Sequence, residues 1–365
     1  MLKARKLTSF ESAALGLEYN LADGHATFEW PDEYEFVRSR LERHFFDSLV
    51  ARQGDEEIRF VESFTRLSKQ SRPRHARLTP SASMSLEIAA HALRSTGRLK
   101  VGMIEPTFDN LADIFARVGL SLAPLAPEEI REGHFENASN VDALVIVWPN
   151  NPFGDGYSTH EFARLLRFAE RSRVAIVFDF SFRLLSTPMA TFDQYDMLTA
   201  SGVQYICIED TGKVLPANDL KVSMLSSSPE LATAVETVAQ DMYLATSRFS
   251  LRLNAELLDV SATVADLPAS RLAMTNAEIL EGALGSLVVP PAGPISVRVL
   301  DLGKVGVDGS AIVRRAEKAG VGVLPLAPFF WSEVERGANL VRIALARDRN
   351  LFACGVEVLR QIIGV

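Results

Sequence analysis

Lys213 stands directly after Gly212 in the segment IEDTGK, and its amine is the first candidate for chemistry in this chain. A lysine in such a turn is often only a solvated loop residue. The Gly-Lys pair also resembles the end of a nucleotide-binding P-loop. However, Cys207 stands where that loop has its first glycine, and Val214 stands where a serine or threonine must reach magnesium. A Schiff base with an aldehyde suits this lysine better, because that role needs an amine that is held in place and easily deprotonated.

Short apolar runs alternate with amphipathic stretches along most of the chain. The apolar runs are Val101–Ile104, Ala143–Trp148, Val174–Phe178 and Val203–Ile208, and the amphipathic stretches are Leu86–Leu93, Asn110–Val118 and Thr159–Glu170. Continuous apolar runs bounded by turn residues are typical of strands that are buried on both faces. Their alternation with helices predicts an α/β fold, with a mostly parallel sheet and right-handed crossovers between two layers of helices.

A segment rich in proline and glycine, VPPAGP at residues 289–294, separates this region from a tail with another pattern. The tail is expected to contain a strand at Ile295–Leu300, a helix at Ser310–Ala319, a strand at Leu340–Leu345 and a closing helix. We therefore predict a large domain over residues 31–275 and a small α+β domain over residues 276–365.

Composition excludes several classes of partner. The net charge of -8 argues against nucleic acid or an anionic membrane surface as the main partner. The two cysteines, Cys207 and Cys354, are too few for a disulfide framework and have no zinc-ligand spacing. The basic N-terminal segment is not followed by the roughly 7 to 15 apolar residues of a signal peptide, and no run approaches the roughly 18 residues of a membrane span. A cytoplasmic protein is expected.

Polar and aromatic segments follow each predicted strand of the large domain. They read EPTFDN, PNNPFG, DFSFR and EDTGK in chain order. In a doubly wound sheet, ligands bind at the carboxyl ends of the strands, so these four segments are expected to converge on one ligand.

These motifs resemble those of fold-type I enzymes that depend on pyridoxal 5'-phosphate (PLP), in the class I/II aminotransferase family. The resemblance puts Asn151 of PNNPFG beside the phenolic oxygen of the cofactor, and Asp179 of DFSFR at its pyridine nitrogen. Phe108 takes the place of the aromatic residue that stacks on the ring. The family usually has tyrosine where Phe182 stands, so Ser181 is expected to supply the missing hydroxyl.

The same resemblance assigns the groups that hold phosphate and carboxylate. Lys213 carries the cofactor, and Thr211 and Lys221 are expected at the phosphate. Ala82 and Ser83 begin a helix, where backbone N–H groups favour phosphate. In addition, Arg342 of NLVRIALAR matches the arginine that grips the α-carboxylate of the substrate.

An ordinary aminotransferase that acts on a basic amino acid is one hypothesis for the reaction. The N-terminal segment LTSFESAALGLEYNLADGHA points elsewhere, because it resembles the PLP-dependent arginine hydroxylase/deaminase group of enduracididine biosynthesis and its relatives. PTFDNLADIF, IEDTGK, DLK and VRIALAR also look like that group, in the same order. Members of the group oxidise free L-arginine with O2, without flavin or metal, and release ammonia and hydrogen peroxide. Their products are 4-hydroxy-2-oxoarginine, 2-oxoarginine or a desaturated arginine.

The resemblance implies roles for an N-terminal arm over residues 1–30. Glu11 and Asp23 would bind the guanidinium of the substrate with help from Thr8, and His25 would lie over the face of the cofactor and move protons. A homodimer with the active site at its interface is also implied. Two residues depart from the group, Glu105 where histidine is expected and Phe180 where a small polar residue is expected, and both are expected near the cofactor.

Overall fold

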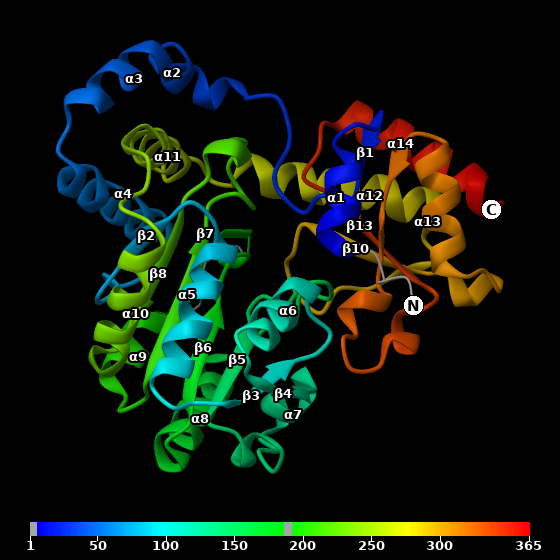
Figure 1. The fold of residues 1–365 in the computed structure, drawn as a ribbon. Helices are drawn as coiled ribbons and strands as arrows, with labels where there is room; N and C mark the ends of the chain where they lie inside the picture. Colours follow the sequence, from blue (N-terminus) through cyan, green and yellow to red (C-terminus); the bar gives the residue numbers. More distant parts are fainter. Residues whose placement is uncertain (1–5, 186–191) are drawn as a thin grey trace.

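Seven strands form the central sheet of the protein, in the order β2-β8-β7-β6-β5-β3-β4 (Figure 1). The structure is a computed structural model that describes residues 6–185 and 192–365, so residues 1–5 of the predicted arm lie outside it. The strands are β2 (Arg77–Thr79), β3 (Lys100–Ile104), β4 (Ser121–Leu125), β5 (Ala143–Val147), β6 (Ala175–Asp179), β7 (Tyr205–Asp210) and β8 (Ser223–Ser227). The strands from β3 to β7 run parallel, and β8 is antiparallel to both of its neighbours, β7 and β2. The predicted mostly parallel α/β sheet is confirmed.

Helices cover both faces of this sheet. On one face lie α5 (Ala82–Ser95), α6 (Asp109–Arg117) and α10 (Pro229–Met242), and on the other lie α7 (Pro127–Glu132), α8 (Thr159–Ser172) and α9 (Gln194–Ala200). Side chains alternate between the two faces along each strand, as the pleat requires. In β5, for example, Val145 and Val147 pack toward the first group of helices, whereas Leu144 and Ile146 pack toward the second.

The C-terminal part forms a second, smaller sheet. Its order is β12-β13-β10-β9, and it is antiparallel throughout. The strands are β9 (Val288–Val289), β10 (Val297–Asp301), β12 (Leu324–Pro325) and β13 (Leu340–Ala344), and the helices packed on them are α12 (Pro268–Leu284), α13 (Gly309–Lys318) and α14 (Arg349–Ile363). Because α12 runs through residue 275, the predicted boundary between the domains falls within a single helix.

The N-terminal segment is tied into the small domain before it enters the large one. After α1 (Leu7–Ala14), the short strand β1 (Tyr19–Asn20) pairs in parallel with β11 (Val321–Gly322). The backbone N–H of Ala344, at the end of β13, donates to the carbonyl of Leu21 at 2.8 Å. The chain then passes along α2 (Glu35–Arg38) and α3 (Leu41–Val50), which arch over α11 (Arg248–Ser261), before α4 (Gln53–Ser68) packs on α11 (Figure 1).

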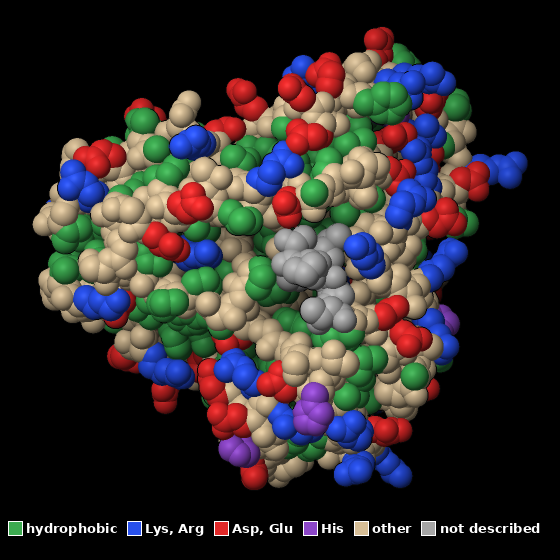
Figure 2. Space-filling model, turned by 180° about the vertical axis from the view of Figure 1, so that it is seen from behind, with side chains coloured by type: hydrophobic (Ala, Val, Ile, Leu, Met, Phe, Trp, Pro, Cys, Tyr) green, Lys and Arg blue, Asp and Glu red, His purple; other side chains and the backbone are tan. Residues whose placement is uncertain are grey.

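Acidic and basic side chains are intermingled over the face of the molecule that Figure 2 shows, between apolar groups. Within the described ranges, no helix is both long and apolar enough to cross a bilayer.

Candidate active site

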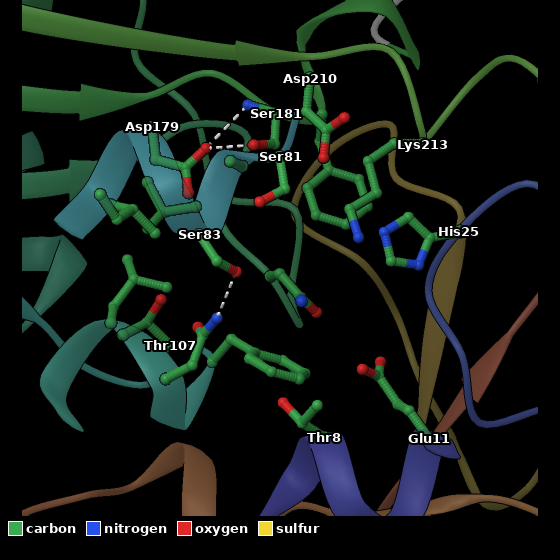
Figure 3. Close-up of a pocket in the computed structure, with 18 of the residues that line it drawn as sticks. Thr8, Glu11, His25, Ser81, Ser83, Thr107, Asp179, Ser181, Asp210 and Lys213 are labelled. Atoms are coloured by element: carbon green, nitrogen blue, oxygen red, sulfur yellow. Dashed lines mark hydrogen bonds between the residues drawn. The ribbon is translucent and has the colours of Figure 1, made fainter. Parts of the chain in front are cut away.

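A cavity of about 230 Å³ lies at the carboxyl ends of β5, β6 and β7 (Figure 3). The predicted site residues that line it are Thr8, Glu11, His25, Ala82, Ser83, Phe108, Asn151, Asp179, Ser181, Lys213, Lys221 and Arg342. Thr8 and Glu11 reach into it from α1, on the side opposite Asp179 (Figure 3). The fold thus brings the N-terminal arm and the three central strands to one place. Of the predicted residues, only Asp23 and Thr211 are absent from the lining.

Lys213 follows β7 after a tight turn. Oδ1 of Asp210 accepts the N–H of Gly212 at 2.8 Å, which closes this turn. A Cβ atom on residue 212 would lie 2.8 Å from Cδ of Lys221 and 2.9 Å from Cδ2 of His25, so only glycine fits without displacing them. The amine of Lys213 makes no hydrogen bond or ion pair with a residue that the structure describes, and it points toward the ring of His25 (Figure 3). The amine is therefore open to a ligand.

His25 is oriented by Asp23. Oδ1 of Asp23 lies 2.6 Å from Nδ1 of His25 and accepts the backbone N–H of the same residue at 3.0 Å. Burial opposes ionisation of Asp23, but the hydrogen bond and charge of His25, with the charge of Lys213, hold the pKa of this carboxyl well below its usual range. Asp23 does not line the cavity. Asp23, which was predicted to bind the guanidinium of the substrate, thus lies behind His25. It holds Nδ1 of the ring and leaves Nε2 free.

Asp179 ends β6 and is almost fully buried. Its Oδ1 accepts the backbone N–H of Ser181 at 2.9 Å and the hydroxyl of Ser181 at 2.5 Å. Burial raises the pKa of the Asp179 carboxyl, against these hydrogen bonds, which lower it. The single hydroxyl proton of Ser181 is used by Asp179, so the expected donation from Ser181 to a cofactor oxygen is not available in this arrangement.

Thr211 is placed behind the wall of the cavity. Its hydroxyl donates to Oδ1 of Asn254 at 2.8 Å and accepts the backbone N–H of Val222 at 3.0 Å. The hydroxyl thus faces Asn254 and Val222 rather than the cavity, where a phosphate contact was expected. Asp210 lines the cavity instead. It stands three residues before Lys213, at the end of β7.

The start of α5 forms one end of the cavity. Ser81 is the N-cap of this helix, so the backbone N–H groups of Ala82 and Ser83 point outward from the positive end of the helix dipole. Lys221 adds a cation to the lining, and its Nζ donates to the carbonyl and to Oδ1 of Asn218, both at 3.1 Å. This end of the cavity is suited to a dianionic group.

Arg342 is 1% exposed and lies over the rings of Phe108 and Phe329, 5.9 Å and 5.7 Å from their centres. Its Nη2 donates to Oε1 of Glu11 at 3.2 Å and to the carbonyl of Ala22. Its Nε is buried and has no hydrogen-bond partner among the described residues. One part of this guanidinium thus holds the arm, and the rest remains able to bind an anion.

Several buried polar atoms of the cavity wall lack partners. They are Oγ1 of Thr107, Oδ1 of Asn110 and Oδ1 of Asn151, none of which has a partner within the described part of the chain. Such atoms cost free energy unless a ligand or water satisfies them. Thr107 and Asn110 were not predicted, although both lie in the segment EPTFDN that was expected at the ligand.

Glu105 and Phe180, the two residues that differ from the arginine hydroxylase/deaminase group, do not line the cavity. Glu105 accepts the backbone N–H and the hydroxyl of Ser332, each at 2.6 Å, and so ties the end of β3 to the small domain. Phe180 stacks on Phe178 with 5.1 Å between ring centres. Neither side chain reaches the position beside the ligand that was expected of it.

The family model for aminotransferase class I and II matches residues 65–284, which is more than half of the chain. The chain belongs to this family. It is therefore a PLP-dependent enzyme, and the family resemblance seen in the sequence is confirmed. No curated protein sequence gives a significant match.

Several solved structures are similar to this chain. The structure of MppP soaked with the product 2-ketoarginine is similar over 95% of this chain and 100% of its own, with 28% identity and a TM-score of 0.87. Aspartate aminotransferase from Thermus thermophilus with maleate matches 99% of this chain and 97% of its own at 18% identity, with a TM-score of 0.79. N-succinyldiaminopimelate aminotransferase from Mycobacterium tuberculosis has 17% identity over 98% of this chain and 97% of its own, with a TM-score of 0.79. The last two likenesses show the fold alone.

Proposed function

We propose that this enzyme is a PLP-dependent, oxygen-consuming oxidase of free L-arginine. The observation that carries the proposal is the position of the arm. It brings Thr8, Glu11 and His25 into the same cavity as Lys213. The likeness to MppP, whose structure was soaked with the product 2-ketoarginine, supports the same substrate class.

The cavity fits PLP. Its buried polar atoms without partners call for a ligand rich in hydrogen-bonding groups, and the end formed by Ala82, Ser83 and Lys221 suits the phosphate. Asp179 would hold the pyridine nitrogen, Asn151 the phenolic oxygen, and Phe108 the face of the ring. When bound, PLP supplies an electron sink for the carbon that bears the amino group.

The remaining groups suit the two ends of L-arginine. Arg342 would bind the α-carboxylate through the nitrogens that the arm leaves free, and Glu11 with Thr8 would receive the guanidinium. Lys213 would take the proton from Cα once its amine is free. His25, with Nδ1 held by Asp23, would accept a proton from Cβ or Cγ at Nε2, or activate water there.

The products follow from how far the oxidation proceeds. One O2 and one water convert arginine to 2-oxoarginine with ammonia and hydrogen peroxide. Two O2 and two waters give 4-hydroxy-2-oxoarginine, ammonia and two hydrogen peroxides. Removal of hydrogen without hydrolysis would leave a desaturated arginine. These products would serve a specialised pathway such as antibiotic biosynthesis.

An oxygen electrode tests the proposal. The holoenzyme is mixed with L-arginine in the absence of any 2-oxo acid, and dissolved oxygen and peroxide are followed together. Many turnovers of oxygen are expected. The alternative, an ordinary aminotransferase of a basic amino acid, is favoured by the family match and would stop after a single turnover. L-Citrulline, which has nearly the same shape as arginine without its charge, should react much more slowly if Glu11 recognises the guanidinium.

A homodimer is also part of this proposal. Consecutive turns of α3 expose Phe45, Phe46, Leu49 and Val50, which are 45%, 57%, 53% and 85% accessible. The spacing of three and four residues puts these side chains on one face of the helix. Exposed apolar faces of this kind mark sites of association, and a second copy of the chain would cover it.

A further inference from the structure

Arg347 lies just beyond β13 and is 2% exposed, and each of its three side-chain nitrogens donates a hydrogen bond. Its Nε donates to the carbonyl of Asn20 at 2.7 Å, and its Nη1 donates to the carbonyls of His25 at 2.6 Å and Ala346 at 2.9 Å. Its Nη2 donates to the carbonyl of Asp23. All three nitrogens therefore have protein partners, and three of the four acceptors belong to the arm.

Arg342, five residues earlier, provides the contrast. Its hydrogen bonds to the described part of the arm come from Nη2, and its Nε has no partner among the described residues. A guanidinium with spare donors beside a cavity can bind a ligand, whereas one whose nitrogens are all engaged by protein cannot do so without losing those bonds. Arg342 is thus suited to binding, and Arg347 to holding the protein itself.

The stretch that Arg347 holds has no regular secondary structure between Leu21 and Gly24. Buried carbonyls in such a stretch need donors from elsewhere. A guanidinium presents its donors in a rigid plane. Three carbonyls that accept from it are therefore held at fixed positions relative to one another. Lysine, with a single ammonium on a flexible stem, cannot reach all three.

The position of this stretch matters because His25 has little room. Cδ2 of His25 would meet a Cβ on residue 212 at 2.9 Å, so the ring already lies against the backbone before Lys213. A shift of the arm by a few tenths of an ångström would change how Nε2 faces the amine and the substrate.

We propose that Arg347 is the positioning residue that sets the Asp23–His25 pair over Lys213. The effect of Arg347 on catalysis rests on the proposed function, whereas its effect on the position of His25 does not. The guanidinium binds the backbone carbonyls of Asp23 and His25, while the carboxylate of Asp23 orients the imidazole ring. Both links are needed to keep Nε2 directed into the cavity.

The test compares Arg347→Lys with Arg349→Met, which changes an exposed arginine at the start of α14. Arg347→Lys keeps the charge and one donor nitrogen in place of three, so the protein is expected to fold. Histidine is labelled with ¹⁵N, and the His25→Gln variant identifies the signals of His25 among the six histidines. In the native protein the neutral ring should carry its proton on Nδ1. In Arg347→Lys the ¹⁵N chemical shifts of Nδ1 and Nε2 of His25 should move toward the average of the two tautomers. In Arg349→Met both chemical shifts should equal those of the native protein.

Oxygen uptake with L-arginine gives a second readout. It should fall roughly 10- to 100-fold in Arg347→Lys, because small misplacements of a catalytic group cost about that much. The visible absorbance of bound PLP should remain. Unchanged His25 signals in folded Arg347→Lys would overturn the inference. If the native enzyme fails to consume oxygen, the proposed function is wrong, and the comparison of His25 signals still decides the role of Arg347.

Discussion

Oδ1 of Asp23 lies 2.6 Å from Nδ1 of His25, and the same oxygen accepts the backbone N–H of His25 at 3.0 Å. One carboxylate oxygen thus holds both the backbone and the ring of one histidine. A buried carboxylate in this relation selects the tautomer with the proton on Nδ1 and leaves Nε2 as a base. Ordering of an imidazole by a carboxylate is a recurrent way to prepare it for proton transfer.

Asp23→Asn should therefore slow oxygen consumption roughly 10- to 100-fold with L-arginine, because the ring loses its charged partner. Retention of PLP should be unchanged, since Asp23 does not line the cavity. The control is Asp32→Asn, at an exposed position. Oxygen uptake and the ratio of hydroxylated to simple keto product are measured together. Native rates and native product ratios in Asp23→Asn would show that the orientation of His25 is not needed.

Gly212→Ala should weaken the binding of PLP at least tenfold and reduce activity. The new methyl group would lie 2.8 Å from Cδ of Lys221 and 2.9 Å from Cδ2 of His25. Lys221 is flexible and can move away, taking its charge with it, whereas the ring of His25 is held by Asp23. Titration of the apoenzyme with PLP, followed by absorbance, measures the loss.

The matched control for this change is Gly282→Ala. Gly282 lies in α12, and an added Cβ there would meet nothing within 4 Å. Alanine in an exposed helix is favoured over glycine by about 1 kcal/mol, so this variant should melt at a slightly higher temperature with native PLP affinity. Equal PLP affinity in both variants would contradict the steric role assigned to Gly212.

The sequence predicted the strands that carry long apolar runs, and missed those that do not. β8 has the sequence SMLSS and is nevertheless buried along its whole length, because it lies between β2 and β7 and packs against α5 and α10. Three serines in five residues give no hydrophobic signal. The same limit applied to β2, whose neighbour in the sheet, β8, lies far along the chain.

Site residues were predictable as sets, but their side-chain directions were not. The loop after β7 was correctly expected at the cavity, yet the turn points Asp210 inward and Thr211 toward Asn254. Arg347 gave no signal at all, because its partners Asn20 and His25 precede it by more than 300 residues. Such contacts become visible only once the fold has brought the two ends of the chain together.

Replacing Phe46 and Leu49 by glutamate should convert a dimer into a monomer. Both side chains are more than half exposed on α3, and two charges per copy would oppose burial of that face in an interface. Sedimentation velocity measures the mass of each species. The control is Val365→Glu, which adds a charge at a residue that is 45% exposed at the C-terminus. A native protein that sediments as a monomer would contradict the proposed dimer.

Asp109 connects the arm to the large domain and should make stability depend on pH. Its Oδ2 accepts the backbone N–H of Leu7 at 3.1 Å, and Oδ1 is buried with no partner in the described ranges. Burial raises the pKa of this carboxyl to about 6. Between about pH 4 and pH 6 the folded state therefore holds a proton that the unfolded state has released, and the free energy of unfolding falls as the pH rises through this range.

Asp109→Asn removes this cost and retains an acceptor for Leu7. At pH 8 the variant should be more stable than the native protein by roughly 1 to 3 kcal/mol, because the native carboxylate is ionised there at a buried site that raises its pKa to about 6. At pH 4 the two should unfold at nearly the same urea concentration, because both then carry a neutral side chain. Urea unfolding at the two pH values measures the difference. A variant less stable than the native protein at pH 8 would show that the charged carboxylate is instead favourable at the start of α6.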